Sequence, residues 1–122
     1  MLEINNVFKS IKEKKIISDI SFNVNYGEIF GLLGPNGAGK TSTFYIIAGL
    51  INADNGKLIL ENEDITTMPM HLRSNLGLKY LPQEPSIFLN LTVKDNLYGL
   101  AELSFESKDD IKNFIDASIE EF

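Results

Sequence analysis

The sequence predicts an α/β fold in which a glycine-rich loop joins a strand to a helix. Three observations support this prediction. Apolar and polar residues tend to alternate at Leu2–Phe8 and again at Ile20–Val24, the pattern of half-buried strands. Ile29–Leu33 (IFGLL) is almost wholly apolar, as in a strand whose two faces are covered. Thr41–Leu50 has the length of a helix, and the glycine loop precedes it.

The first half of the chain is expected to build a small antiparallel sheet. The two alternating segments flank the basic stretch Lys12–Lys15, which we expect to be the solvated turn of a hairpin. Asn25–Gly27 is expected to be a turn before the apolar run. Beyond the helix, Asn52–Gly56 is expected to be a loop. Lys57–Leu60 (KLIL) is then expected to add a strand to the hairpin.

The middle of the chain is expected to contain a short helix followed by a strand. Asp64–Thr67 is expected to be a connection, and Pro69 suits the first turn of a helix through Asn75. Leu78–Leu81 (LKYL) is predicted to be a strand, which Pro82 stops because proline cannot donate to a ladder.

The sequence of the last third of the chain predicts two helices. Thr92 is spaced from Asp95 as an N-cap is from an acid at the third position, so a helix is expected toward Leu103. Ser107 opens a second helix, whose apolar residues fall on one face: Ile111, Phe114, Ile115, Ile119 and Phe122. Because the chain reaches Phe122 within this stripe and without a C-cap, we expect it to be part of a longer domain.

Composition narrows the possible functions. The 122 residues allow one domain, and the net charge of −6, from 17 acidic and 11 basic residues, argues against a nucleic acid partner. No cysteine and one histidine exclude a disulfide framework and a zinc cluster. No apolar run approaches the roughly 18 residues of a membrane span, so a link to a membrane would go through a partner.

Gly34–Thr41 matches the phosphate-binding pattern G-x-x-x-x-G-K-[ST]. Glycines allow torsions that turn successive N–H groups inward around phosphates, and the start of the helix adds its positive end. Lys40 is expected to reach the terminal phosphates, and the Thr41 hydroxyl to bind Mg²⁺. A chance glycine turn is disfavoured by the strand and helix expected on either side. The predicted nucleotide site comprises Gly34, Pro35, Asn36, Gly37, Ala38, Gly39, Lys40, Thr41 and Ser42.

With GLLGPNGAGKTS and, later, YLPQEPSIF, all 122 residues resemble the ATP-binding subunit of ABC transporters. Within that family, residues 63–97, EDITTMPMHLRSNLGLKYLPQEPSIFLNLTVKDNL, are most similar to the cytoplasmic ATPase of bacterial lipopolysaccharide exporters. The resemblance implies a P-loop NTPase of the ABC ATPase type, with ATP and Mg²⁺ as ligands. It further implies that residues 1–84 are the N-terminal part of the nucleotide-binding core with its antiparallel β subdomain, and that 85–122 begin a helical subdomain.

The resemblance also implies roles outside the loop. Gln83 would contact Mg²⁺ or the attacking water. It would thus be a metal ligand, as Thr41 would, and a catalytic residue, as Lys40 would. The alternative is that Gln83 is a surface amide in a loop. The segment Gln83–Leu91 would dock the transmembrane subunits, with Phe88 as an exposed anchor or, alternatively, as a core residue. The complete protein would be a homodimer, peripheral on the cytoplasmic side of the inner membrane. It would hydrolyse ATP to drive lipid export.

Three further residues are relevant to catalysis or to contact with adenine. His71 is expected to be a surface or capping residue without a catalytic role. Ile11 stands where the family usually has an aromatic residue that stacks on adenine, and Phe8 is close in sequence, so we expect weak discrimination between bases.

The sequence also departs from the family after Gln83. It has no LSGGQ-like signature, no apolar strand ending in Asp-Glu and no later histidine. The string nearest to the signature is LSFES at Leu103–Ser107, which has no glycines. Glu61 and Glu84 are not expected to act as a base. We therefore expect the 122 residues of this chain to bind ATP but not to hydrolyse it. A stand-alone regulatory module and an ABC ATPase of DNA repair or translation are the alternatives.

Overall fold

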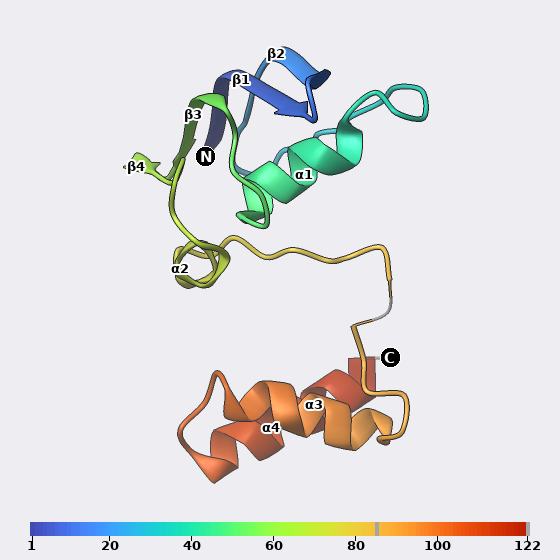
Figure 1. Cartoon of the computed structure of the whole chain (residues 1–122). Coiled ribbons are helices and arrows are strands. Elements are labelled where there is room, and N and C mark those ends of the chain that lie inside the picture. The colour runs from blue at the N-terminus through green and yellow to red at the C-terminus, as the bar shows by residue number, and fades with distance from the viewer. Residues whose placement is uncertain (85, 122) are drawn as a thin grey trace. The chain divides into compact units, whose positions relative to one another are not determined.

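The computed structural model describes residues 1–84 and 86–121. The chain divides into two compact units, Met1–Leu81 and Pro82–Phe122. The first unit contains a four-stranded sheet with the order β2-β1-β3-β4, together with helices α1 and α2. The second contains helices α3 and α4 (Figure 1). The predicted α/β fold class is confirmed.

Strands β1 (Leu2–Ile11) and β2 (Lys14–Val24) form the expected antiparallel hairpin. Its two-residue turn, Lys12 and Glu13, has positive φ at both positions (47° and 66°), which matches the right-handed twist of the flanking strands. The basic stretch around this turn is exposed, as predicted. The strands are longer than the alternating pattern indicated: β1 continues past Phe8 to Ile11, and β2 starts at Lys14, before Ile20.

Strands β3 (Asn55–Leu60) and β4 (Glu63–Asp64) complete the sheet, with β3 antiparallel to β1. The register of β1 shifts beside Asn6, which has a φ of 48° and whose side-chain amide donates to Asp19 at 2.8 Å. The bulge brings β3 close to β1 there: a Cβ atom on Gly56 would lie 2.5 Å from the Asn6 carbonyl oxygen. Only glycine fits at this point of the sheet.

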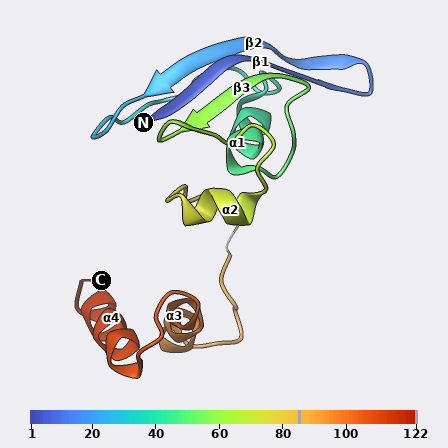
Figure 2. The ribbon, with the colours of Figure 1, turned by 90° about the vertical axis from the view of Figure 1, so that its left-hand side faces the viewer.

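Helix α1 (Lys40–Ala48) lies under the sheet, and α2 lies on the other side of α1 (Figure 2). It packs through Ile46, which shares one buried cluster with the apolar residues of the sheet: Ile4, Val7, Ile17, Leu58 and Leu60. The helix ends two residues before the predicted Leu50, because Gly49 adopts a left-handed conformation with a φ of 82°. Its N–H bonds to the Ile46 carbonyl, and the Leu50 N–H bonds to the Tyr45 carbonyl.

The short helix α2 (Met70–Asn75) is confirmed, with one change at its start. Pro69 was expected inside the first turn but is the N-cap, in an extended conformation. Its carbonyl oxygen accepts from the N–H groups of Leu72 and Arg73 at 3.1 and 3.2 Å. Because an N-cap residue needs no N–H of its own inside the helix, proline is tolerated there.

Two predicted strands are wrong. Neither Ile29–Leu33 nor Leu78–Leu81 is a strand, and no strand within residues 1–84 and 86–121 pairs with them. Ile29 is fully exposed, and Leu33 is 93% exposed. The physical reason is that an apolar extended segment becomes a strand only when a neighbouring strand supplies ladder hydrogen bonds. The short connection predicted at Asp64–Thr67, by contrast, starts inside β4.

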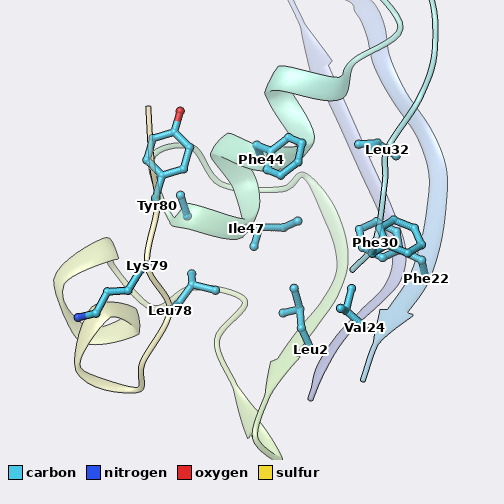
Figure 3. Close-up of a pocket in the computed structure, with 11 residues that line it drawn as sticks. Leu2, Phe22, Val24, Phe30, Leu32, Phe44, Ile47, Leu78, Lys79 and Tyr80 are labelled. Carbon is cyan, nitrogen blue, oxygen red and sulfur yellow. The ribbon is translucent and has the colours of Figure 1, made fainter. Parts of the chain in front are cut away.

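An apolar cavity of about 240 Å³ lies between these two segments (Figure 3). Phe30 and Leu32 line it on one side, and Leu78 and Tyr80 line it on the other. Phe30 is stacked on Phe22 of β2, with ring centroids 4.6 Å apart. The first segment is thus tied to the sheet by side-chain packing and not by a backbone ladder.

The second unit contains α3 (Val93–Glu102) and α4 (Lys108–Glu121). Its N-cap prediction is confirmed, because the Thr92 hydroxyl oxygen accepts from the Asp95 N–H at 3.1 Å. The predicted stripe of α4 is only partly buried: Ile111 and Ile115 pack with Ala101 and Leu97 of α3, whereas Phe114 and Ile119 remain exposed. Phe122, the last predicted member, lies outside the described residues.

Asp54 anchors the connection before β3 to β1. Its carboxylate is 2.6 Å from the Lys9 ammonium and accepts from the Ser10 N–H at 2.7 Å. The hydrogen bond from Lys9, followed by that from Ser10, lowers the pKa of Asp54 below its ordinary value of 3.8. A lowered folded-state pKa means that the stabilisation is present above pH 3.8 and is lost as the pH falls through the folded-state value.

We therefore expect Asp54→Asn to lower the melting temperature at pH 7, and to lower it less and less as the pH falls below 3.8. Thermal denaturation monitored by circular dichroism between pH 7 and pH 3 measures this. Asp116→Asn, at an exposed position of α4, is the matched control. A decrease for Asp54→Asn that is the same at both ends of this pH range would contradict the assignment.

Candidate nucleotide-binding site

The glycine loop has the backbone torsions that its sequence predicts. Gly37 and Gly39 adopt left-handed conformations, with φ values of 82° and 88°. At Gly39 the restriction is also spatial, since a Cβ atom there would lie 2.5 Å from the Ile16 carbonyl oxygen and 3.2 Å from Ile17 Cγ1. The end of the loop therefore lies directly against β2, beside the start of α1.

The loop carries a run of free backbone donors. Among the described residues, only one N–H of the stretch from Asn36 to Ser42 has an acceptor: the Ala38 N–H bonds to the Pro35 carbonyl at 3.2 Å. The other six belong to Asn36, Gly37, Gly39, Lys40, Thr41 and Ser42. Three of these are in the first turn of α1, where a helix leaves its donors unpaired and its dipole is positive. The arrangement suits an anion with several oxygen acceptors.

Lys40 bends back over the loop that precedes it. Its ammonium donates to the carbonyls of Gly34 and Pro35, at 2.5 and 2.8 Å. These neutral acceptors bind a cation less strongly than an ionised oxygen does. An anion in the loop would therefore compete with them for the Lys40 ammonium.

The side chains that follow Lys40 divide into exposed and structural ones. Thr41 is exposed, and no described residue is bonded to its hydroxyl, so it is free to bind a metal ion as an oxygen ligand. Ser42 is half-buried. Thr43 was missed by the sequence reasoning: it is buried, and its hydroxyl donates to the Gly39 carbonyl at 3.0 Å. The signal for it is a hydroxyl four residues after the last glycine.

The hydroxyl, the loop donors and Lys40 fit a nucleotide phosphate with Mg²⁺. Magnesium prefers oxygen ligands, keeps several waters and is usually bound by few protein groups together with substrate phosphates. The structure brings the nine predicted residues, Gly34 to Ser42, together in one continuous stretch. The exposed backbone of Gly34–Ala38 leaves the cradle open to a ligand.

The remaining predicted residues lie outside this stretch. Gln83 belongs to the second unit and is exposed there, as is Glu84. Phe88 is 72% exposed, so the core alternative is wrong, and docking stays a prediction. Its backbone is held by the Asn96 side chain, which accepts from the Phe88 N–H at 2.8 Å and donates to its carbonyl at 3.1 Å. Asn96 was not identified from the sequence.

Glu61 forms hydrogen bonds within the first unit. Its carboxylate accepts hydrogen bonds from the N-terminal ammonium and from the Tyr26 hydroxyl, and these lower its pKa. A lowered pKa makes a carboxylate a weaker base, and the prediction that Glu61 does not act as a base stays a prediction. His71 is exposed on α2, also as expected. Ile11 is the last residue of β1 and is largely exposed.

Comparison with known proteins places this geometry in a family. The ABC transporter family matches residues 17–121. The chain therefore belongs to the ABC transporter family, and the sequence resemblance is confirmed.

Curated relatives carry more specific names. The lipopolysaccharide export system ATP-binding protein LptB of Haemophilus influenzae is 52% identical over 103 residues, which cover 84% of this chain and 43% of that protein. The protein of the same name from Escherichia coli K12 is 46% identical over 112 residues, which cover 88% of this chain and 46% of that protein. The chain thus spans less than half the length of these relatives.

Solved structures show the same fold. A nucleotide-free ATP-binding cassette from an ABC transporter has a TM-score of 0.75 and 32% identity, over 90% of this chain and 44% of that one. The ADP conformation of MJ1267, an ATP-binding cassette of an ABC transporter, has a TM-score of 0.77 and 30% identity, over 93% and 44%. Among the described helices, none is both long and apolar enough to cross a membrane.

The contact between Gly39 and β2 can be tested with a matched pair of variants. Gly37 and Gly39 have similar positive φ values, but a Cβ atom on Gly37 would meet nothing within 4 Å. Alanine at either position costs about 1–2 kcal/mol of backbone strain. Gly39→Ala should cost about 1–3 kcal/mol more, because its Cβ atom overlaps the Ile16 carbonyl. Urea denaturation of both variants without nucleotide measures the difference, and equal stabilities would contradict the close approach.

Proposed function

We propose that the chain is the ATP-binding part of an ABC transporter ATPase that couples ATP hydrolysis to the export of lipopolysaccharide or another lipid across the inner membrane. The observation that carries the proposal is the set of six free N–H groups within Asn36–Ser42, together with the Lys40 ammonium. The names of the relatives from Haemophilus influenzae and Escherichia coli support the transported class. No comparison favours a stand-alone regulatory module.

In this proposal the loop binds the phosphates of ATP. The free donors of Asn36–Ser42 surround the phosphate oxygens, and Lys40 exchanges the carbonyls of Gly34 and Pro35 for the terminal phosphates. Thr41 would hold Mg²⁺, and a role for Gln83 as a further metal ligand stays a prediction from the resemblance. When bound, Mg²⁺ neutralises charge on the phosphate groups.

The complete protein would hydrolyse ATP as a homodimer, with Gln83 near the attacking water. For the 122 residues alone we propose binding without turnover. The carboxylate of Glu61 is held by the N-terminal ammonium and Tyr26, and Glu84 is exposed in the second unit. With Ile11 in place of an aromatic residue, adenine would gain apolar contact without stacking.

Nucleotide binding is expected to depend on Lys40. Lys40→Ala removes the cation that meets the β and γ phosphates, so the affinity for Mg-ATP should fall at least about tenfold, since a charged hydrogen bond contributes about 1.5–3 kcal/mol. Isothermal titration calorimetry on the parent and the variant measures this. Lys57→Ala is the matched control, because the Lys57 ammonium is exposed and contacts Asp64 at 3.5 Å.

Equal Mg-ATP affinity in Lys40→Ala and the parent would refute the site. The same preparations also test the absence of turnover. Phosphate release by the 122-residue parent is expected to equal that of Lys40→Ala. A faster rate that depends on Lys40 would show that a base lies within these residues.

We further propose that the second unit docks transmembrane subunits, which would place the protein peripherally on the cytoplasmic side of the inner membrane. A mostly apolar groove of about 530 Å³ runs along α3 within this unit. Phe88 is one of its large exposed side chains. Its lining includes Ile87, Phe88, Leu89, Leu91, Val93, Leu97, Leu100 and Leu103.

Phe88→Ala in the full-length protein is expected to weaken docking. A buried aromatic anchor at an interface often contributes 2 kcal/mol or more, a change of roughly 30-fold. Co-purification with the membrane subunits measures this, and Ile119→Ala, at an exposed apolar position of α4 outside the groove, is the control. Normal yield of the complex from Phe88→Ala would contradict a docking role for Phe88.

A further inference from the structure

The only arginine of the chain is buried. Arg73, on α2, is 1% exposed, whereas the other basic residues are lysines. Its guanidinium makes four hydrogen bonds, all to main-chain carbonyls. Nη1 donates to Ile46 at 2.6 Å and Ile47 at 2.7 Å, Nε donates to Met68 at 2.6 Å, and Nη2 donates to Thr66 at 3.3 Å. One side chain thereby joins α1, α2 and the segment after β4.

Two of these bonds reach the last turn of α1. The carbonyls of Ile46 and Ile47 are among those that a helix leaves without intrahelical partners at its C-terminus. That end of a helix also carries partial negative charge, and α1 has no basic residue of its own in the last turn. Arg73 therefore supplies, from another helix, a donor to each of these carbonyls and the cation that this end lacks, and the Ile46 carbonyl also accepts from the Gly49 N–H.

The packing around this contact is tight. A Cβ atom on Gly49, the C-cap of α1, would lie 2.9 Å from Arg73 Nε and 3.1 Å from the Met70 N atom. Glycine is needed at this position for its left-handed φ and also to admit the guanidinium. Backbone and side-chain contacts thus occur together where the end of α1 lies against α2.

The opposite end of α1 follows the glycine loop, Gly34–Gly39, which is the proposed phosphate loop. The helix has nine residues, and at 1.5 Å per residue its two ends are roughly 13 Å apart. Over that length, a tilt of about 5° at the Arg73 end moves the first turn by roughly 1 Å. Displacements of that size are large for groups that must meet a ligand in a defined geometry.

We infer that Arg73 is a positioning residue for the phosphate loop: by fixing the C-terminal end of α1 it sets where Lys40 and the loop N–H groups meet the phosphates. This inference rests on the proposed nucleotide site. Lysine cannot replace Arg73, because an ammonium has three donors at one point and cannot span four carbonyls held by a planar fork.

The test compares Arg73→Lys and Arg73→Gln with Lys79→Gln. Lys79 is an exposed cation near α2 that bonds weakly to Ser74, so it controls for the loss of one positive charge. Mg-ATP affinity is measured by calorimetry well below the melting temperature of each variant. Backbone amide NMR shifts of Gly37, Gly39 and Thr41 are measured without nucleotide, because a role confined to the stability of the α1–α2 contact would leave them unchanged.

We expect both Arg73 variants to bind Mg-ATP at least tenfold more weakly and to show shifted loop amides, and Lys79→Gln to match the parent. Parent-like affinity and unshifted loop amides in folded Arg73→Lys would overturn the inference. So would failure of both Arg73 variants to fold, which would assign Arg73 to folding. If the parent itself does not bind Mg-ATP, the proposed function fails, and the loop amide shifts alone decide the role of Arg73.

Discussion

Ile46 of α1 is 2% exposed because it shares a buried cluster with the apolar face of the sheet, and the position of the phosphate loop depends on that burial. Burying such a side chain contributes about 1.5–3 kcal/mol. The cluster fixes the helix against β1–β3 along its C-terminal half. In the first turn of the helix Thr41 stays exposed, and the N–H groups of Lys40, Thr41 and Ser42 have no acceptor among the described residues. One helix thereby combines an apolar anchor with a polar binding end.

Backbone contacts that only glycine permits determine how closely α1 approaches its neighbours. Gly39 at its start lies against the Ile16 carbonyl, and Gly49 at its end lies against Arg73. Both have left-handed torsions, so each meets a conformational and a spatial requirement at once. In the phosphate-binding pattern, the last glycine is thus explained by β2 as well as by the ligand.

The sequence was sufficient where the structural signal is local. The loop torsions, the hairpin and the Thr92 cap each depend on residues that are close together in the chain. The strands predicted at Ile29–Leu33 and Leu78–Leu81 failed because strand formation requires a neighbour, which an apolar run does not reveal by itself. Part of the α4 stripe stayed exposed for a similar reason, since apolar spacing predicts a face but not what covers it.

The side chains that sequence reasoning missed share one property. Thr43, Arg73 and Asn96 all bond to main-chain groups. Main-chain acceptors have the same chemistry in every residue, so no partner residue type marks such a contact in the sequence. Arg73 was visible only as an isolated cation in a short helix, and its burial follows from the tertiary fold.

The choice of acceptors at Arg73 also determines how solution conditions act on the protein. Main-chain carbonyls do not titrate, and a buried cation bound to them is far less exposed to counterions than a surface ion pair is. The pair between Lys9, on the interior strand β1, and Asp54 is partly exposed, so acid and salt should weaken it. The attachment of α1 to α2 contains no acid. Loosening of the first unit by low pH or high ionic strength should therefore begin in the strands, while the helix that carries the phosphate loop keeps its anchor.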